Sequence, residues 1–187
     1  MPGLRVIGGE AKGRKLRMVP GESTRPIGDR VKESLFNILS GDLPQARFLD
    51  LFAGTGGVGI EALSRGAAWA TFVERDPRAC DVIRQNLAHT CLMERGEVVR
   101  ADVFHLLARH PALGYDMVYV APPQYQQLWE RTLLLLDEHT EWLRPDAAVI
   151  VQVHPTELRA LPLHHLQEYD RRKYGSTLLV FFEWPSV

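Results

Sequence analysis

From residue 46 onward, short apolar runs alternate with stretches of helical periodicity, and this alternation restricts the possible folds sharply. We expect strands, with helices between them, at residues 47–52, 69–74, 97–101, 115–121 and 147–153. The last of these runs is so apolar that both of its faces should be buried, as in the strands of a parallel sheet. The pattern therefore predicts an α/β fold with a mostly parallel, doubly wound sheet.

Two segments near the C-terminal end have the composition of a β-hairpin. They cover residues 165–173 and 176–184, and we expect the chain to turn near Gly175. Strands joined by such a tight turn are antiparallel. The sequence therefore predicts an antiparallel hairpin at one edge of the sheet.

The first 40 residues are organised differently. We expect two short strands joined by a glycine-containing turn and then a helix with Asp29 as its N-cap, at residues 4–8, 14–19 and 29–40. We therefore expect a small hairpin-and-helix extension over residues 1–40 and a main domain over residues 41–187.

Length and composition exclude several classes of protein. The chain has 187 residues, of which 45% are hydrophobic and 24% charged, so it can bury a core and is not a disordered chain. No apolar run approaches the roughly 18 to 20 residues of a membrane span, and the first residues lack the apolar stretch of a secretory signal. Cys80 and Cys91 are too few for a disulfide framework, and the histidines do not cluster at metal-ligand spacing. We expect a cytoplasmic protein without a metal site.

The charges are distributed unevenly along the chain. Residues 1–33 contain eight Lys or Arg and four Asp or Glu, a balance of +4, whereas the remainder has a balance of −5. A basic end on an acidic body predicts a polyanionic partner. The alternative is a solvated hairpin whose charges bind nothing.

A glycine-rich loop follows the strand predicted at residues 47–52. Gly54, Gly56 and Gly59 form a Gly-x-Gly-x-x-Gly pattern that opens the next predicted helix. Glycines allow a tight turn and a close approach of ligand to backbone, and the helix N-terminus offers N–H groups. The pattern alone is weak evidence, because glycines after a strand are often only turn residues.

Two acidic residues make the interpretation of this loop more specific. Glu74 ends the next predicted strand, 20 residues after Gly54, where a carboxylate can accept hydrogen bonds from both ribose hydroxyls of a nucleoside. Asp50 precedes the loop, and its carboxylate would repel a pyrophosphate but suits a ligand with an ammonium and a sulfonium group. This favours S-adenosylmethionine over NAD. The alternatives are that Glu74 is a solvated strand end and that Asp50 caps the backbone N–H groups of the loop.

Asp102 follows the third predicted strand, at the carboxyl edge of the sheet where ligands bind in such folds. It can accept a hydrogen bond from an adenine amino group, or it can be the N-cap of the helix predicted at residues 103–109. The two roles are compatible.

Three stretches of the chain resemble the RsmD family, bacterial enzymes that methylate a guanine N2 in 16S ribosomal RNA. The stretches are Thr24-Arg25-Pro26 followed by Asp29 to Asn37 (DRVKESLFN), Asp50 to Gly56 (DLFAGTG) and Glu61 to Ala67 (EALSRGA). Residues 5–16 and 174–177 also resemble the ends of that family, so the resemblance covers the whole chain in order. The first stretch is far more specific than the glycine loop, which all class I methyltransferases share.

The resemblance implies a Rossmann-like class I methyltransferase with S-adenosylmethionine as cofactor. The residues implied to bind this cofactor are Asp50, Phe52, Ala53, Gly54, Thr55, Gly56, Gly59, Glu74, Arg75, Asp102 and Val103. The implied partner is 16S rRNA or the small ribosomal subunit, contacted by basic residues of the extension because such residues supply most sequence-independent RNA affinity. These candidates are Arg5, Lys12, Arg14, Lys15, Arg25, Arg30 and Lys32.

The predicted catalytic loop departs from the usual pattern. Enzymes that methylate amino groups usually carry Asp or Asn, two prolines and then Tyr or Phe after the fourth strand. This chain has Ala121-Pro122-Pro123-Gln124-Tyr125, and the expected catalytic residues are Ala121, Pro122, Pro123 and Tyr125. Ala121 removes a side chain that would accept a hydrogen bond from the target amine, although backbone carbonyls can still accept. Tyr125 lies one position beyond the usual aromatic residue.

The favoured interpretation is methylation of a guanine N2 in small-subunit rRNA. Ala121 and Gln124 leave open a catalytically impaired member that binds rRNA or ribosome precursors, and the loop alone leaves open an amino group on another base. An NAD-linked oxidoreductase is disfavoured by Asp50 and by the absence of a Tyr-x-x-x-Lys pair.

Overall fold

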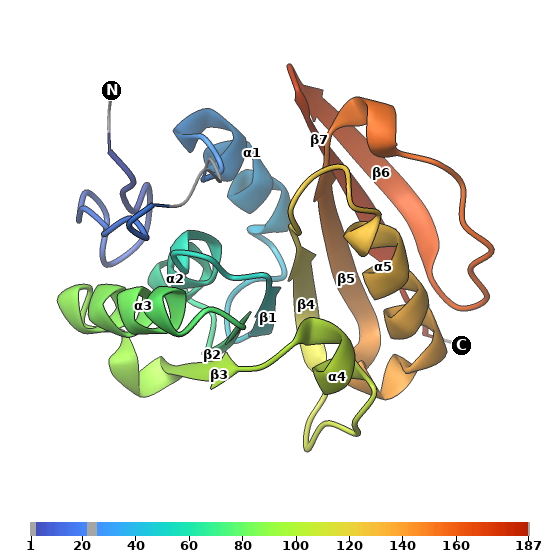
Figure 1. The fold of residues 1–187 in the computed structure, drawn as a ribbon, viewed down its shortest axis with the longest axis horizontal. Coiled ribbons are helices and arrows are strands. Elements are labelled where there is room, and N and C mark those ends of the chain that lie inside the picture. Colours follow the sequence, from blue (N-terminus) through green and yellow to red (C-terminus); the bar gives the residue numbers. More distant parts are fainter. Residues whose placement is uncertain (1–2, 22–25, 187) are drawn as a thin grey trace. The chain divides into compact units, whose positions relative to one another are not determined.

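A computed structural model describes residues 3–21 and 26–186. The chain divides into two compact units, residues 1–101 and 102–187 (Figure 1). The N-terminal extension lies within the first unit and is not a compact unit of its own. Its separate role as an RNA-facing domain over residues 1–40 remains a prediction.

The first unit is built on three parallel strands in the order β3-β2-β1 (Figure 1). Its elements are α1 (Asp29–Leu39), β1 (Arg47–Leu51), α2 (Gly57–Ser64), β2 (Trp69–Glu74), α3 (Pro77–His89), the 3-10 helix η1 (Met93–Arg95) and β3 (Gly96–Arg100). Helix α2 packs on β1 and β2, and α3 packs on β2 and β3. Asp76 accepts a hydrogen bond from the backbone N–H of Arg78 and caps α3, as the Asp-Pro pair predicts.

The second unit has four strands in the order β4-β5-β7-β6 (Figure 1). Its elements are α4 (Val103–Leu107), β4 (Tyr115–Val120), α5 (Leu128–Glu138), η2 (Thr140–Trp142), β5 (Leu143–Val153), η3 (Pro155–Glu157), β6 (Gln167–Tyr174) and β7 (Thr177–Glu183). Strands β4 and β5 are parallel, whereas β7 is antiparallel to both β5 and β6. The predicted α/β class and the antiparallel C-terminal hairpin are confirmed.

Two boundaries in the second unit differ from the predicted ones. The leucine-rich pattern of residues 127–142 predicts one long helix, but α5 ends at Glu138, because the chain leaves the helical conformation at His139. A 3-10 turn then brings Trp142 into the core, where its indole N–H donates to the carbonyl oxygens of Leu107 and Arg109.

Strand β5 also begins earlier than expected, at Leu143 instead of residue 147. Its pairing with β4 shifts register between Tyr115 and Met117, and Asp146 has a φ of 62°. An irregularity of this kind lets a strand continue past residues that do not fit the regular ladder.

The N-terminal hairpin is less regular than expected. A single antiparallel bridge joins Arg5 to Lys15, in place of two continuous strands. The backbone N–H groups of Ile7 and Gly8 donate to the carboxylate of Glu61 on α2. The extension is therefore attached to α2 as well as to itself.

The start of α1 also corrects an expectation. Its N-cap is Gly28, and Asp29 is the first helical residue. The Asp29 carboxylate pairs with Arg5 at 3.0 Å, so it ties the helix to the extension. Among the helices formed by residues 3–21 and 26–186, none is long and apolar enough to cross a membrane.

Candidate cofactor site and catalytic loop

The glycine loop connects β1 to α2 through backbone conformations that favour glycine. Gly54 has a φ of 57° and Gly56 a φ of 79°, both in the left-handed region. Gly59 is required for another reason, since a Cβ there would lie 2.4 Å from the ring of Phe72. A Cβ on Gly54 would meet nothing within 4 Å, so the backbone of the loop can be approached closely at this point.

Asp50 lies beneath this loop, at the end of β1. Its side chain is buried, and Oδ2 accepts a hydrogen bond from the backbone N–H of Gly59 at 3.0 Å. Burial raises the pKa of the Asp50 carboxyl well above its usual range, and the hydrogen bond from Gly59 opposes the shift. The structure therefore shows the loop-capping role, and a role toward a ligand remains a prediction.

Glu74, at the end of β2, folds back onto the same loop. Oε2 accepts from the N–H of Gly54 at 2.9 Å, and Oε1 accepts from Arg75 and Asp76 at 2.9 and 3.0 Å. A carboxylate has about four acceptor positions, so Oε2 has room for a further donor such as a ribose hydroxyl. The structure therefore places Glu74 against the glycine loop, and its contact with ribose hydroxyls remains a prediction.

In the second unit, Asp102 is the N-cap of α4. Its Oδ1 accepts from the N–H groups of Phe104 and His105 at 2.9 and 3.1 Å. Val103, the first residue of the helix, is buried. The capping role of Asp102 is confirmed, and contact with an adenine remains a prediction.

Glu61 is the residue that holds the N-terminal extension, and no motif in the sequence marks it as a site residue. Its buried carboxylate pairs with Lys32 at 3.2 Å and with Arg65 at 2.8 Å, in addition to the N–H groups of Ile7 and Gly8. Glu61 and Lys32 belong to two different stretches that carry the family resemblance. Their place in these stretches was the only sequence feature that could have indicated a contact between them.

Lys32 was expected to contact RNA, and the structure corrects this expectation. Its side chain has no exposed surface, and Nζ also donates to the carbonyl oxygen of Arg5. Burial lowers the pKa of the Lys32 ammonium, which the neighbouring Glu61 carboxylate opposes. Lys32 holds the fold together and cannot contact RNA from this position.

Most of the other basic candidates are at the surface. Exposed side chains belong to Arg5, Lys12, Arg14, Lys15 and Arg30. Arg14 donates to the carbonyl oxygen of His89 at 2.6 Å, at the end of α3. Arg25 lies outside the described residues.

The predicted catalytic loop joins β4 to α5. Ala121 and Pro122 are half-buried, whereas Pro123 is exposed. Tyr125 is also exposed, with 66% of its surface accessible, and its φ is 61°. Asp116 at the start of β4 pairs with Arg144 at 3.0 Å, so it does not replace the acid missing at residue 121.

Two residues beside this loop were missed by the sequence analysis. The backbone N–H of Tyr125 donates to Oε1 of Glu157 at 2.6 Å, and the rings of Tyr125 and His154 lie 5.7 Å apart between centroids. Glu157 is the last residue of the turn η3 after β5, and His154 is the N-cap of that turn. The sequence signal was weak, because a capping box built on a histidine is not a recognisable pattern.

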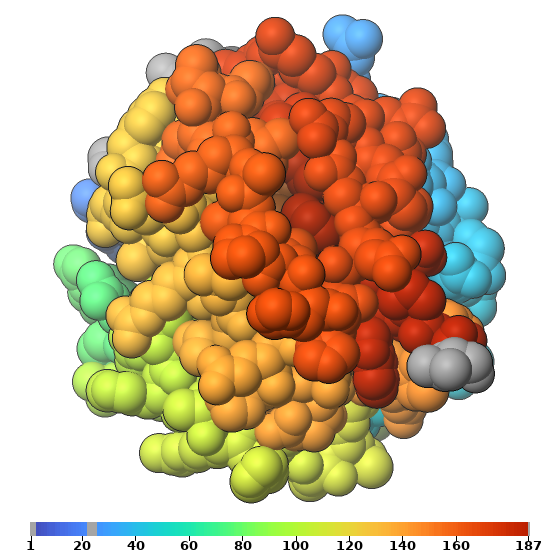
Figure 2. Space-filling model, turned by 90° about the vertical axis from the view of Figure 1, so that its right-hand side faces the viewer, coloured from blue at the N-terminus to red at the C-terminus, as the bar shows by residue number. Residues whose placement is uncertain are grey.

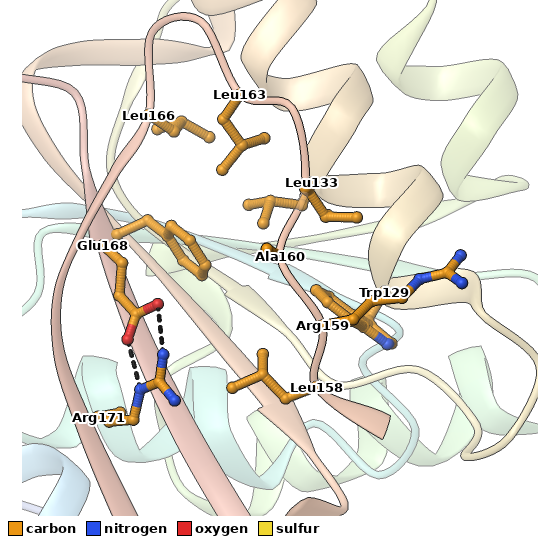
Figure 3. A pocket seen from close by; sticks show the side chains of 11 residues that line it. Trp129, Leu133, Leu158, Arg159, Ala160, Leu163, Leu166, Glu168 and Arg171 are labelled. Carbon is orange, nitrogen blue, oxygen red and sulfur yellow. Dashed lines mark hydrogen bonds and ion pairs between the residues drawn. The ribbon is translucent and has the colours of Figure 1, made fainter. Parts of the chain in front are cut away.

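A cavity of about 410 Å³ lies in the second unit between α5, β6 and the segment that joins β5 to β6 (Figure 3). Trp129, Leu133 and Leu158 contribute apolar walls. The charged groups at its edge are paired within the protein, as Arg171 with Glu168. None of the predicted site residues lines this cavity. In the described part of the chain, no group of three or more His, Cys, Asp or Glu side chains is arranged to hold a metal ion.

The family described as "Conserved hypothetical protein 95" matches residues 4–183 of this chain. The chain is a member of the RsmD family. It is 39% identical to the ribosomal RNA small subunit methyltransferase D of Haemophilus influenzae over 151 residues, which cover 80% of this chain and 78% of that protein. The Escherichia coli protein of the same name is also 39% identical, over 80% of this chain and 74% of its own length.

Solved structures agree with this family assignment. The protein yhhF of Escherichia coli superposes with a TM-score of 0.87 and 34% identity, over 98% of this chain and 99% of that one. A hypothetical protein from Thermus thermophilus gives a TM-score of 0.77 and 32% identity, over 95% of this chain and 97% of its own. The resemblance stated from the three sequence stretches is thereby confirmed.

Proposed function

We propose that this protein transfers a methyl group from S-adenosylmethionine to the exocyclic N2 amine of a guanine in 16S rRNA. The observation that carries the proposal is the conjunction of Glu74 with the glycine loop, in a chain whose RsmD-family relatives are named small-subunit rRNA methyltransferases. The relatives' names support an rRNA substrate, and the arrangement of the loop supports a nucleoside cofactor.

The residues of the first unit fit such a cofactor. The loop from Phe52 to Gly56 offers backbone that a ligand can approach closely, and Oε2 of Glu74 can accept from ribose hydroxyls. Asp50 supplies a carboxylate near the loop for a positively charged group. When bound, S-adenosylmethionine would supply a methyl group on a positively charged sulfur; the sulfur would keep the bonding electrons, and the methylated amine would release one proton to solvent.

The residues after β4 would hold the target base. A guanine N2 is a poor nucleophile because its lone pair is delocalised into the ring, so the base must be extruded and aligned. The exposed ring of Tyr125 offers a surface on which a base can stack. The carbonyl oxygens of Ala121 and Pro122 would accept hydrogen bonds from the amine as positive charge develops on nitrogen.

The N-terminal extension would bind the RNA backbone. Its exposed basic residues are held on α2 through Glu61, and charges of this kind attract phosphates regardless of sequence. We therefore assign residues 1–40 an RNA-facing role, with 16S rRNA or the small subunit as the partner. A protein that acts on ribosomal RNA in a bacterium would work in the cytoplasm.

A second function is kept because Ala121 and Gln124 depart from the usual motif. In that case the protein would bind rRNA or ribosome precursors without methylating them. Nucleoside mass spectrometry of small-subunit rRNA that lacks the modification separates the two. After incubation with the protein and S-adenosylmethionine, we expect new N2-methylguanosine in naked rRNA or in assembled subunits. Binding of cofactor and RNA without methyl transfer to either form would contradict the enzymatic proposal and favour the binding protein.

A further inference from the structure

Tyr125 combines two features that are unfavourable for a residue without a function. It is the most exposed of the large hydrophobic side chains on the described surface, at 66%, and its φ of 61° lies in the left-handed region. Gln127, two residues on, has a φ of 57° as well. Left-handed backbone is costly for residues other than glycine, and it persists only where the surrounding structure enforces it.

The surrounding structure that enforces this conformation is the turn after β5. Oε1 of Glu157 accepts the backbone N–H of Tyr125 at 2.6 Å. Oε2 of the same carboxylate accepts the N–H of His154 at 3.2 Å, which closes a capping box around η3. One carboxylate therefore joins two loops that are 32 residues apart in sequence.

The turn also supports the aromatic ring. His154 lies against Tyr125 with an interplanar angle of 41°. Nδ1 of His154 accepts the N–H of Thr156 at 3.2 Å, which fixes the orientation of the imidazole. The two segments lie side by side in Figure 1, and in Figure 2 the yellow residues of the loop after β4 adjoin the orange residues that follow β5.

We propose that Glu157 is a positioning residue that holds Tyr125, with His154 packed against its ring, as the stacking surface for the extruded base. The inference rests on the proposed function. It accounts for an aromatic residue one position later in the loop than expected, because the left-handed turn at Tyr125 redirects the chain and Glu157 fixes that turn. Glu157 acts through Tyr125 and does not contact the reacting atoms.

Methyl-transfer kinetics on small-subunit rRNA test this role. We expect Glu157→Ala to lower kcat about tenfold, since loss of alignment slows the chemical step, and to leave the KM for S-adenosylmethionine unchanged. Glu157→Gln should recover part of the loss, because its carbonyl oxygen can still accept one of the two N–H groups. Glu138→Ala, at an exposed glutamate at the end of α5, is the matched control and should behave like the wild type. Equal kcat values for Glu157→Ala and the control would overturn the inference.

A double-mutant cycle separates positioning from a general structural effect. In a Tyr125→Ala background, Glu157→Ala should reduce kcat by less than about twofold further, because residues that act through one another are not additive. Two independent reductions that multiply would overturn the inference.

Amide hydrogen exchange on the protein alone gives a readout that does not depend on methyl transfer. Glu157→Ala should accelerate exchange at residues 121–127, with the largest effect at the Tyr125 amide, whereas Glu138→Ala should not. Unchanged exchange would overturn the inference even if the wild type is an active enzyme. If the wild type methylates no form of the rRNA, the proposed function fails, and the exchange result alone then decides whether Glu157 positions Tyr125.

Discussion

Asp50 is a carboxylate that the fold removes from water and gives one backbone hydrogen bond, from Gly59. Burial raises its pKa above the ordinary value of 3.8. The folded protein therefore holds this proton over a pH interval in which the unfolded chain has already released it. By linkage, the free energy of unfolding falls as the pH rises through that interval. A loss of stability caused by a buried carboxylate is typical of a site that requires this charge to bind a ligand.

We predict that Asp50→Asn removes this pH-dependent cost. Relative to the wild type, its free energy of unfolding should increase as the pH rises above the ordinary pKa of 3.8, because the amide does not titrate. Urea unfolding at a series of pH values measures the difference. The same variant should bind S-adenosylmethionine more weakly, as calorimetry would show. A difference in unfolding free energy that is constant with pH would contradict a raised pKa of the Asp50 carboxyl.

Ala121 supplies no side-chain acceptor at the residue where related amino-methylating enzymes carry Asp or Asn. We predict that Ala121→Asn raises kcat by roughly a hundredfold, since one hydrogen bond to developing charge is worth about a hundredfold to a thousandfold. Single-turnover methyl transfer measures the effect. Ala112→Asn, at an exposed position between α4 and β4, is the matched control. An unchanged rate for Ala121→Asn would contradict the prediction and show that the backbone acceptors suffice.

At the scale of elements, the main connection is between the N-terminal extension and α2. The carboxylate of Glu61 accepts from Ile7 and Gly8 and pairs with Lys32. Ser64, one turn later, donates to the carbonyl oxygen of Gly8 at 2.6 Å. The extension is thus positioned by buried polar contacts and not by a regular hairpin.

We predict that the buried ion pair between Lys32 and Glu61 contributes far more to the free energy of unfolding than the exposed pair between Arg5 and Asp29. Lys32→Ala removes the fully buried one of the two cations that pair with the Glu61 carboxylate and should cost about 3 kcal/mol of unfolding free energy. Arg5→Ala breaks an exposed pair with Asp29 and should cost less than about 1 kcal/mol. Urea unfolding at neutral pH compares the two variants. Similar values would mean that Lys32 is more accessible than the structure shows.

Gly9 gives a second test of the same connection. A Cβ there would lie 1.9 Å from the carbonyl oxygen of Ser64, so Gly9→Ala should release the extension from α2. Gly13→Ala is the matched control, because its φ of 85° is equally unusual but a Cβ would meet nothing within 4 Å. We expect faster limited proteolysis and weaker RNA binding in Gly9→Ala, with cofactor binding unchanged. Equal rates of proteolysis for both variants would contradict the prediction that a Cβ at residue 9 releases the extension from α2.

For the molecule as a whole, the uneven charge along the chain predicts that the basic extension binds the RNA phosphates. Lys12→Ala with Lys15→Ala should weaken RNA binding across sequences and reduce the salt dependence of the affinity by about 0.7–0.9 per lost phosphate contact. Filter binding at several salt concentrations measures the slope. Lys173→Ala, at an exposed lysine of β6, is the control. An unchanged salt dependence would show that these two lysines of the extension do not contact RNA phosphates.

Much of the fold followed from local patterns. Apolar strands between amphipathic helices predicted the α/β class, and the Asp-Pro pair predicted the start of α3, because periodicity and capping depend on neighbouring residues. The boundaries at His139 and Leu143 were predicted less well. They depend on the burial of Trp142 and on a register shift between strands, and neither is a local property.

Sequence patterns alone were enough to locate the glycine loop and Glu74, because a strand, a tight turn and a helix place such residues together over a short stretch of chain. Only the tertiary structure showed that Lys32 is buried against Glu61 and that Tyr125 is held by Glu157. These contacts join segments about 30 residues apart in sequence, so they depend on how elements pack. Charge counting cannot distinguish a lysine that faces water from one that holds a helix to its neighbour, because burial is decided by the whole fold.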